Sequence, residues 1–518
     1  MTITAPPPRQ RTLPVADKGL KLGAIGLVSS LVLGVASTAP GYSLAATLGY
    51  VTQEVGVQAP IIMVLAFIPM LCISYAYRAL NEDTPDCGTS FTWVARTFGR
   101  HAGWLTGWVI VVADVIVMAN LAEVAGQYTL DLLGFASDKA AVTAIGCVWI
   151  IAMTVVAWVG IEFSARTQVF LLGIEIVILL VFSVVALVKV YAGTACTQSL
   201  APRWSWFNPF DSGLTPSALS AGFLLAVFIY WGWDSAVSTN EETKDPYVTP
   251  GRAAVLSTVI LLFTFVLVTV AAQAYGGIGT TGIGLANPAT MDDSLSGIGE
   301  SVLGGWGAKA LFLAILTSAA ASTQTTILPT ARTTLAMAAY RALPRVFGNI
   351  HPRYRTPSVS TWAMGIVSVA FYGGLVWLSE DALGDLIASM GLLIAFYYGL
   401  TGFAAAWEFR AQVRTGLRVA LERVLLPLAG GIILLGAFVL TALDSYAADF
   451  GETSLAGVGG VFLLGVGSIL LGVVLMVGYQ LVAPAYFTGF TMWDRTHVTD
   501  VGEIVPSDRD VPAEPGAP

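Results

Sequence analysis

About twelve apolar runs, each long enough to cross a lipid bilayer, constrain this chain more than any other feature of its sequence. A bilayer core of about 30 Å needs about 20 apolar residues in a helix, and only helices and closed barrels satisfy their own backbone hydrogen bonds there. The 518 residues are 56% hydrophobic and 11% charged, with a mean hydropathy of +0.75, whereas soluble domains carry about 25% charged residues. The sequence therefore predicts an all-α membrane protein. The spans are predicted at residues 22–49, 59–80, 102–133, 140–160, 166–192, 216–242, 252–276, 306–340, 358–379, 383–408, 423–444 and 457–482.

The distribution of lysine and arginine orients these spans. Of the 25 basic residues, 21 fall on the side of the N-terminus, and Lys139, Lys189, Arg203 and Lys309 fall on the other side. Basic loops face the cytoplasm, so we expect both termini in the cytoplasm, an even number of spans and a multi-pass protein of the cell membrane.

The sequence shows no sign of a catalytic or metal site. The four cysteines (Cys72, Cys87, Cys147 and Cys196) and the three histidines lack metal-ligand spacing, and no nucleophile elbow or phosphate loop is present. The net charge of −8 without a basic stripe gives no indication of nucleic-acid binding. We therefore expect no enzyme, no cofactor and no metal, and take the bilayer and a small molecule as the partners.

Two of the predicted spans are interrupted in corresponding positions. The first carries small residues around Pro40, which removes a backbone donor, and the sixth carries Gly232 next to an acid. One such break alone is equally a structural kink, but a matched pair indicates a transporter site, where helix ends offer N–H and C=O groups to a substrate. The candidate substrate-binding residues are Gly34, Ala36, Ser37, Thr38, Ala39, Gly41, Trp231, Gly232, Trp233, Asp234 and Ser235.

Four acids lie well inside the predicted spans, and no lysine or arginine lies at comparable depth. A carboxylate at mid-membrane costs about 2.5–3.5 kcal/mol, and burial disfavours its charged form. Some of these acids are then protonated, or water, a cation or a positively charged substrate compensates them. Asp234 is the first candidate for carrying a coupling proton and Asp114 the second. Glu175 is the third, as a ligand for a proton or sodium, and Glu123 is expected only to line an access path.

Alternatives to these roles stay open. Asp234 could instead bond only to a neighbouring helix. Three hydroxyls of the eighth span, Ser318, Ser322 and Thr323, could supply oxygens near Glu175, but small polar residues also pack membrane helices.

Three stretches of the sequence resemble one known family. They are Phe228–Asp234 with the following Asn240–Pro246, Arg332–Pro344 with His351–Pro357, and Pro85–Gly99. Over roughly residues 20–410 the chain resembles the amino acid–polyamine–organocation superfamily of secondary transporters, especially its bacterial amino acid permeases. This resemblance implies two inverted repeats of five helices, as in leucine-transporter-like folds, with two additional peripheral helices. It also implies alternating access, with substrate at the two breaks, and a substrate-contacting aromatic gate at Phe228.

The implied organisation divides the chain into five parts. A disordered cytoplasmic tail (1–21) precedes the first repeat (22–215) and the second repeat (216–410), and two peripheral helices (411–483) precede a cytoplasmic tail (484–518).

The chain departs from the family pattern at two places. The family has a glycine-rich motif in its first helix, and this chain has the segment Gly34–Gly41 in its place. The backbone there could still bind a substrate carboxylate, but the motif does not define the contacts. Proton-coupled relatives place a lysine where this chain has Glu175, which reverses the charge.

The function expected from these features is proton-coupled uptake of an amino acid, with sodium as the other possible coupling ion. An organic amine or polyamine carrier is the alternative, potassium transport a more distant one, and a receptor or channel the alternative of another class. Both a monomer and a homodimer are compatible with the sequence.

Overall fold

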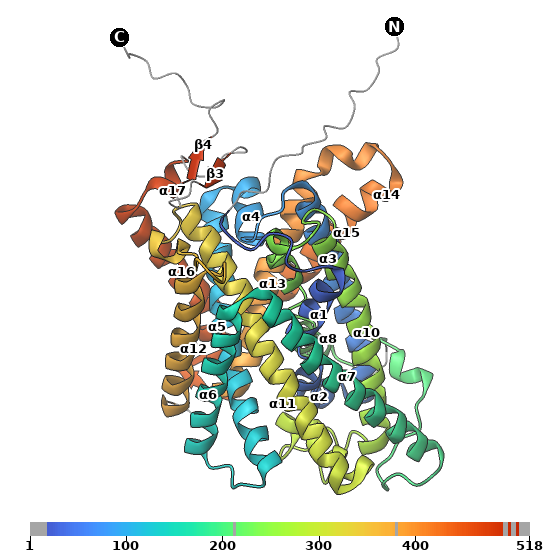
Figure 1. Ribbon diagram of the computed structural model, residues 1–518. Helices are drawn as coiled ribbons and strands as arrows, with labels where there is room; N and C mark the ends of the chain where they lie inside the picture. The colour runs from blue at the N-terminus through green and yellow to red at the C-terminus, as the bar shows by residue number, and fades with distance from the viewer. Residues whose placement is uncertain (1–17, 211–213, 379–381, 490–495, 499–503, 507–518) are drawn as a thin grey trace, which may run out of the picture.

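The computed structural model describes residues 18–210, 214–378, 382–489, 496–498 and 504–506. This part of the chain is nearly all helical, and long helices run side by side from one end of the molecule to the other (Figure 1). Within it, ten helical segments are long and apolar enough to cross a membrane. One of them, Leu27–Asp83, spans 57 residues and contains the first two predicted spans, and the shorter apolar helix Pro216–Ile229 lies at the sixth. The count of twelve spans and the inverted repeat stay predictions.

The break in the first predicted span is present as two helices, α1 (Leu27–Ser37) and α2 (Pro40–Val55). Between them Ala39 adopts a left-handed conformation with φ 45°, which ends the helical path. Pro40 then takes the first position of α2. An N–H at this position has no partner within the helix, so proline costs no hydrogen bond there, and its fixed φ suits a helix.

The sixth predicted span is interrupted in the same way. Helix α8 (Pro216–Ile229) stops before Gly232, whose φ of 117° is left-handed, and the short α9 (Ser235–Ser238) follows. At its start, the Thr215 hydroxyl caps α8 by accepting the N–H of Ala218 at 3.1 Å. The chain leaves α9 through the short 3-10 helix η3 (Asn240–Glu242).

The remaining elements follow the predicted spans closely. They are η1 (Gly56–Gln58), α3 (Ala59–Asp83), α4 (Ser90–Phe98), α5 (Arg100–Leu133), α6 (Lys139–Val159), α7 (Ile161–Tyr191), η2 (Trp204–Phe207), α10 (Thr249–Gly276), η4 (Met291–Asp293), α11 (Ser294–Ala339), η5 (Arg345–Gly348), α12 (Ser358–Leu378), α13 (Ala382–Glu408), η6 (Arg410–Arg414), α14 (Leu417–Ala420), the π-turn η7 (Leu421–Leu425), α15 (Leu426–Asp444), α16 (Gly460–Val482) and α17 (Ala485–Thr488). Two antiparallel two-stranded pairs complete the described chain, β1 (Ser454–Leu455) with β2 (Val458–Gly459) and β3 (Thr496–Val498) with β4 (Ile504–Pro506).

The structure differs from the prediction at three boundaries. Helix α4 lies in a stretch predicted as a loop, because nine residues are too few to register as a span. Helix α11 begins at Ser294 rather than near 306, since two helical pieces join across Gly304 (φ 75°). The ordered chain also reaches back to Lys18 within the predicted tail, where Lys18 and Leu20 are buried; residues 1–17 lie outside the described part.

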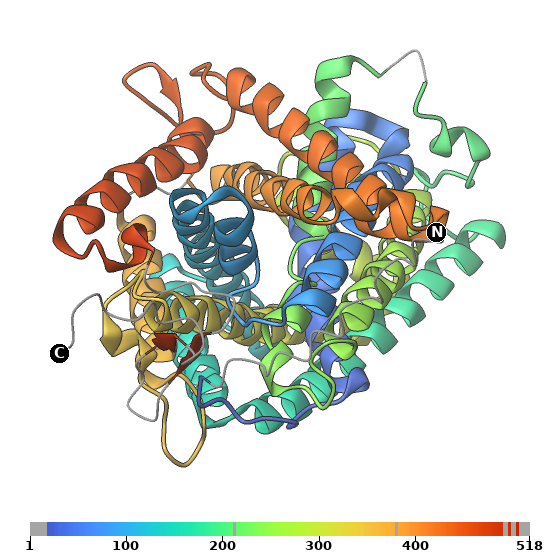
Figure 2. The ribbon, with the colours of Figure 1, turned by 90° about the horizontal axis from the view of Figure 1, so that it is seen from above.

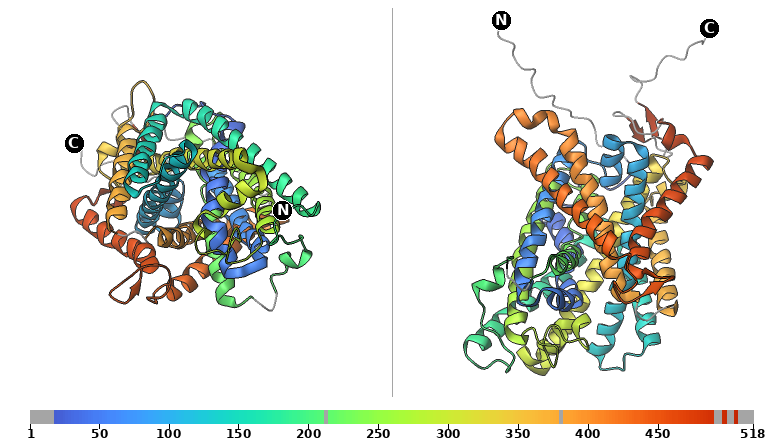
Figure 3. Two further views of the ribbon diagram at one scale, coloured as in Figure 1. Left: turned by 90° about the horizontal axis from the view of Figure 1, so that it is seen from below. Right: turned by 180° about the vertical axis from the view of Figure 1, so that it is seen from behind.

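The surface of the bundle carries apolar side chains suited to lipid. Along α7 one row of exposed residues recurs every seventh position: Phe163, Phe170, Val177, Val184 and Tyr191 are 51–73% exposed. A stripe of this size on a soluble protein would be a partner site, whereas on a membrane helix it faces acyl chains. Helices α15 and α16 lie along one edge of the bundle (Figure 2) and on the near side when it is seen from behind (Figure 3).

One end of the bundle carries α4, α14 and α17 (Figure 1). We call it the basic end, because the arginine- and lysine-rich loops predicted to face the cytoplasm lie there.

Candidate functional site

The two helix breaks touch each other through their backbones. A Cβ atom on Gly232 would lie 2.6 Å from the carbonyl oxygen of Ser37 and 2.7 Å from its carbon. Gly34 also lies against the second break, since a Cβ there would lie 3.2 Å from the carbonyl oxygen of Trp233 and 2.5 Å from the hydroxyl of Ser257. Only glycine at these positions allows the two interrupted helices to meet.

A small cavity of about 20 Å³ lies where the breaks meet. A volume of this size holds about one water molecule, so the structure is a closed state in which no amino acid fits. The cavity contains five predicted site residues: Ser37, Asp114, Trp231, Gly232 and Asp234. Among the described residues that line it, the others are Ile110, Thr326, Pro329 and Tyr397.

Asp234 follows the second break and sits among aromatic rings. Its Oδ2 accepts long hydrogen bonds of 3.4 Å from the hydroxyls of Tyr77 and Tyr397. The Tyr397 hydroxyl in turn accepts the indole N–H of Trp231 at 2.5 Å, and Trp233 packs edge-on against Tyr77 with ring centroids 5.1 Å apart. The carboxylate is therefore positioned by weak neutral donors, which leaves it able to bind a proton or an ammonium group.

The two predicted acids of α5 have different surroundings. Asp114 is 3% exposed, lines the small cavity and accepts a hydrogen bond from the Thr330 hydroxyl of α11. Glu123 lies about two and a half turns further along and accepts a hydrogen bond from the Tyr372 hydroxyl of α12 at 2.5 Å. Asp114 thus shares the cavity with Asp234, and none of the described residues that line this cavity is basic.

Glu175 forms a second polar centre at the start of α2. Its Oε1 accepts the N–H of Gly41 at 2.7 Å and the hydroxyl of Ser318 at 2.9 Å, and the Ser318 oxygen accepts the N–H of Tyr42 at 3.1 Å. An acid suits this place because the first N–H groups of a helix lack partners and carry partial positive charge. Glu175 is fully buried, and its Oε2 has no hydrogen-bond partner within the described chain.

The other predicted hydroxyls divide into two groups. Ser322 donates to the carbonyl of Ser37 at 2.9 Å and so satisfies the end of α1. Thr323 donates to Ala319 of its own helix at 2.8 Å, as a packing hydroxyl does.

The remaining predicted break residues surround the cavity without lining it. Phe228 is buried in α8, 3% exposed, and is not among the residues that line the cavity. Thr38 and Ser235 donate their hydroxyls to the carbonyls of Val35 (2.7 Å) and Gly232 (2.8 Å), which also accept the backbone N–H of the same two residues. Ala36, Ala39 and Gly41 are also buried next to the breaks.

The sequence reasoning did not assign Ile110, Thr326 or Pro329 to the site, and it left Tyr397 open between a cation–π contact with an ammonium group and helix packing. Ile110 lies one turn before Asp114 on α5, so the helical period alone could have placed it on the same face.

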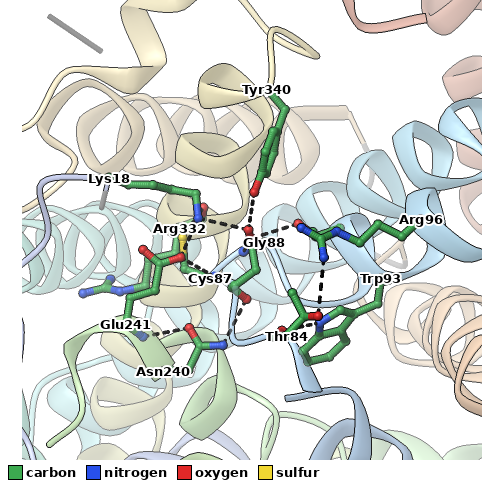
Figure 4. Close-up of polar contacts among 12 residues, drawn as sticks. Lys18, Thr84, Cys87, Gly88, Trp93, Arg96, Asn240, Glu241, Arg332 and Tyr340 are labelled. Carbon is green, nitrogen blue, oxygen red and sulfur yellow. Dashed lines mark hydrogen bonds and ion pairs between the residues drawn. The ribbon is translucent and has the colours of Figure 1, made fainter. Parts of the chain in front are cut away.

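A buried charged cluster lies at the basic end (Figure 4). The Lys18 ammonium contacts Asp86 Oδ2 at 3.1 Å and Glu241 Oε1 at 2.5 Å, and these three side chains are 1–3% exposed. Tyr340 donates to Asp86 at 2.5 Å, and the N–H of Cys87 donates to Glu241 at 2.9 Å. We call these five residues the Lys18 cluster.

Charge pairing sets the protonation of the Lys18 cluster. Burial alone would favour the neutral acid, but the Lys18 ammonium, helped by the Tyr340 hydroxyl, holds the pKa of Asp86 below its usual value. Ligand-type atoms of Asp86, Cys87 and Glu241 lie within 4.8 Å of one another. The ammonium already occupies the position that a metal ion would take, so the cluster gives no reason to expect one.

A second buried ion pair lies beside this cluster. Arg332 of α11 contacts Glu242 of η3 at 2.5 Å, with both side chains at most 1% exposed. The Glu242 carbonyl accepts the N–H of Ile25 at 3.1 Å, and Lys244 N–H donates to the Ile25 carbonyl at 2.9 Å. The N-terminal segment, the exit of the second broken helix and α11 are therefore tied together at the basic end.

Comparison with known proteins agrees with this architecture. The family described as amino acid permease matches residues 22–454. The chain is 26% identical over 453 residues to an uncharacterized transporter of Mycobacterium tuberculosis, covering 87% of this chain and 90% of that protein. It is 26% identical over 399 residues to a branched-chain amino acid permease of Bacillus subtilis (73% and 80% covered) and over 397 residues to a vacuolar cationic amino acid transporter of Arabidopsis thaliana (73% and 61% covered). Two matched helix breaks around a buried cavity, in a bundle with ten candidate spans, are the architecture of a carrier rather than an enzyme, and the chain belongs to the amino acid permease family of membrane transporters.

Proposed function

We propose that this permease is a proton-coupled amino acid symporter of the cell membrane that works by alternating access. The observation that carries the proposal is the meeting of Ser37, Trp231 and Gly232 of the two breaks with Asp114 and Asp234 in one closed cavity. The proposed frame is twelve spans, as two inverted repeats of five with two peripheral helices, and both termini in the cytoplasm.

The charges at the cavity support coupling to protons. Two carboxylates face about 20 Å³ without a basic residue among the described lining, and such a site cannot hold both charges uncompensated. A proton on Asp234 and the ammonium group of the substrate near Asp114 would neutralise the pair. Asp234 is the proposed coupling acid, since the hydroxyls of Tyr77 and Tyr397 bind it weakly, at 3.4 Å each, and so let it change its protonation.

Glu175 is the proposed alternative coupling acid. Its carboxylate accepts a hydrogen bond from the N–H of Gly41. This N–H is one of the helix-end donors that could otherwise bind a substrate carboxylate. A protonated Glu175 accepts this hydrogen bond less strongly, so proton binding there would release a donor for the substrate. Sodium near the unpaired Oε2 is the competing coupling ion.

The same contact supports the second candidate function, transport of an organic amine or polyamine. Ser318 accepts the N–H of Tyr42 as Glu175 accepts that of Gly41, so two helix-end donors are already used inside the protein. A substrate without a carboxylate would not need them.

In this proposal the Lys18 cluster and the Arg332–Glu242 pair hold the transporter closed toward the cytoplasm. Both join the exit of the second broken helix to parts of the bundle that do not belong to it. Opening the cavity toward the basic end requires these buried contacts to separate and the charges to meet water.

Uptake into proteoliposomes tests the proposal. A panel of labelled amino acids and amines is offered with and without an inward proton gradient, to the parent, to Asp234→Asn and to the exposed control Asp449→Asn. We expect one substrate to accumulate only with the gradient, and Asp234→Asn to exchange that substrate without concentrating it while the control behaves like the parent. Accumulation by Asp234→Asn at the parent level would remove Asp234 from coupling, and accumulation driven by sodium alone would refute proton symport.

A further inference from the structure

A second, much larger cavity of about 450 Å³ lies between α5, α11, α12 and α16, away from the helix breaks. Its walls are almost entirely apolar, and the stacked indoles of Trp104 and Trp108, with centroids 6.2 Å apart and planes at 7°, form a flat surface on α5. Nothing in the proposed transport cycle uses this space.

The polar side chains in the wall already donate their hydrogen bonds to other protein groups. Trp104 donates to the carbonyl of Ala342 and Trp108 to that of Ser468, each at 2.9 Å. The hydroxyls of the wall also donate within the protein: Thr330, Thr334, Ser360 and Ser468. A cavity whose donors are already used does not hold water well and favours an apolar ligand.

The cavity opens toward the outside of the bundle. Val367 of α12 and Leu471 of α16 both line it and are still 50% and 52% exposed. In a membrane this mouth faces acyl chains rather than water. A volume of about 450 Å³ equals that of roughly 15 water-sized groups at about 30 Å³ each, which corresponds to one acyl chain of a common phospholipid.

Three arginines lie close in sequence to residues that line the end of the cavity nearest the basic end. Arg341 and Arg345 flank the lining residues Leu343 and Phe347 in sequence, and Arg100 lies one turn before Trp104. The turn that carries Arg341 is fixed against the cavity, because its Ala342 carbonyl accepts the Trp104 indole. Basic groups beside an apolar groove near the cytoplasmic surface match an anionic lipid headgroup.

We propose that an anionic phospholipid binds here, with one acyl chain in the cavity and its phosphate at the arginines. The site is independent of the proposed substrate and coupling ion. It lies directly behind the transport cavity, since Thr330 belongs to its wall and donates to Asp114. An acyl chain in this space packs against α5 and α11 and stabilises the wall that holds Asp114.

Native mass spectrometry of the purified protein in detergent tests the site, with added phosphatidylglycerol or phosphatidylcholine of the same chain length. Ala363→Trp fills the cavity, Val367→Trp blocks its mouth, and Val177→Trp on the exposed stripe of α7 is the matched control. We expect the parent and the control to retain one phosphatidylglycerol about tenfold better than phosphatidylcholine, and both cavity variants to lose this bound lipid.

A separate variant tests the headgroup. Arg341→Gln/Arg345→Gln should bind both lipids equally, because the acyl chain keeps its place while the phosphate loses its partners. Retention of phosphatidylglycerol by Ala363→Trp and Val367→Trp at the parent level would overturn the proposal. So would a parent dimer that both cavity variants dissociate, since a helix of a second copy would then be the occupant. The thermal unfolding midpoint of each variant checks that it is folded.

Discussion

Removing the Lys18 charge should open the basic end of the transporter. In Lys18→Met the side chain keeps its length, but Asp86 and Glu241 lose the ammonium that lies 3.1 and 2.5 Å from their oxygens. Breaking a buried ion pair costs about 3–5 kcal/mol. Asp86 keeps hydrogen bonds from Gly88 N–H and the Thr92 hydroxyl, both at 2.8 Å, so the lower value applies. At 1.4 kcal/mol per tenfold change, about 3 kcal/mol shifts the closed-to-open equilibrium by about a hundredfold.

Cys87 provides a reporter for this opening. Its thiol is fully buried within the Lys18 cluster, and burial, reinforced by the charge of Glu241, raises the pKa of the thiol well above its usual value. With Cys72, Cys147 and Cys196 replaced by serine, Cys87 should react with N-ethylmaleimide very slowly in the closed state. Lys18→Met should raise this rate by about a hundredfold.

Two comparisons decide the result. Lys18→Arg, which keeps the charge, should label at a rate near the parent's, and the thermal unfolding midpoint of each variant separates opening from general unfolding. Labelling of folded Lys18→Met at the parent rate would refute the reasoning that this charge holds the basic end closed.

Three further predictions follow from the same contacts. Gly232→Ala should lower uptake more than tenfold without preventing folding in the membrane, whereas Gly373→Ala, where a Cβ meets nothing within 4 Å, should transport like the parent; equal uptake by both would contradict the close contact of the breaks. Glu175→Leu should lower the free energy of unfolding in denaturant by about 1–3 kcal/mol, because it leaves helix-end donors unpaired. Glu175→Gln keeps an acceptor, so its free energy of unfolding should fall by less than half as much. Because the pKa of Asp86 is lowered in the folded protein, its carboxylate stabilises above the usual pKa of about 4 and this stabilisation is lost only as the pH falls below that value. The difference in unfolding midpoint between the parent and Asp86→Asn should then stay constant from pH 8 to 5 and shrink only in stronger acid.

Local sequence features predicted the helices and the breaks, because their causes are local. An apolar run of twenty residues forms a span wherever it packs, and Pro40 and Gly232 interrupt helices through their own backbone chemistry. The same reasoning missed α4, whose nine residues are too few for a span, and the early start of α11 before Gly304.

The contacts between distant segments were not predictable in this way. Lys18 lies in a polar, proline-rich stretch, and its partners are 68 and 223 residues away. For the cavity, the acids were identified by the cost of burying them, whereas Thr326 and Pro329 entered the lining only through the rotation of α11, which hydropathy does not specify.

The burial of Lys18 bears on how this protein can be produced. Hydropathy places the start of the first span near residue 22, and a shortened recombinant version would normally begin there. Such a version would retain every membrane helix and both helix breaks, yet it would lack the one ammonium group that neutralises Asp86 and Glu241. We expect this version to insert into membranes. We also expect its basic end to close less tightly than in the 518-residue chain, because the missing Lys18 charge lies outside every predicted span.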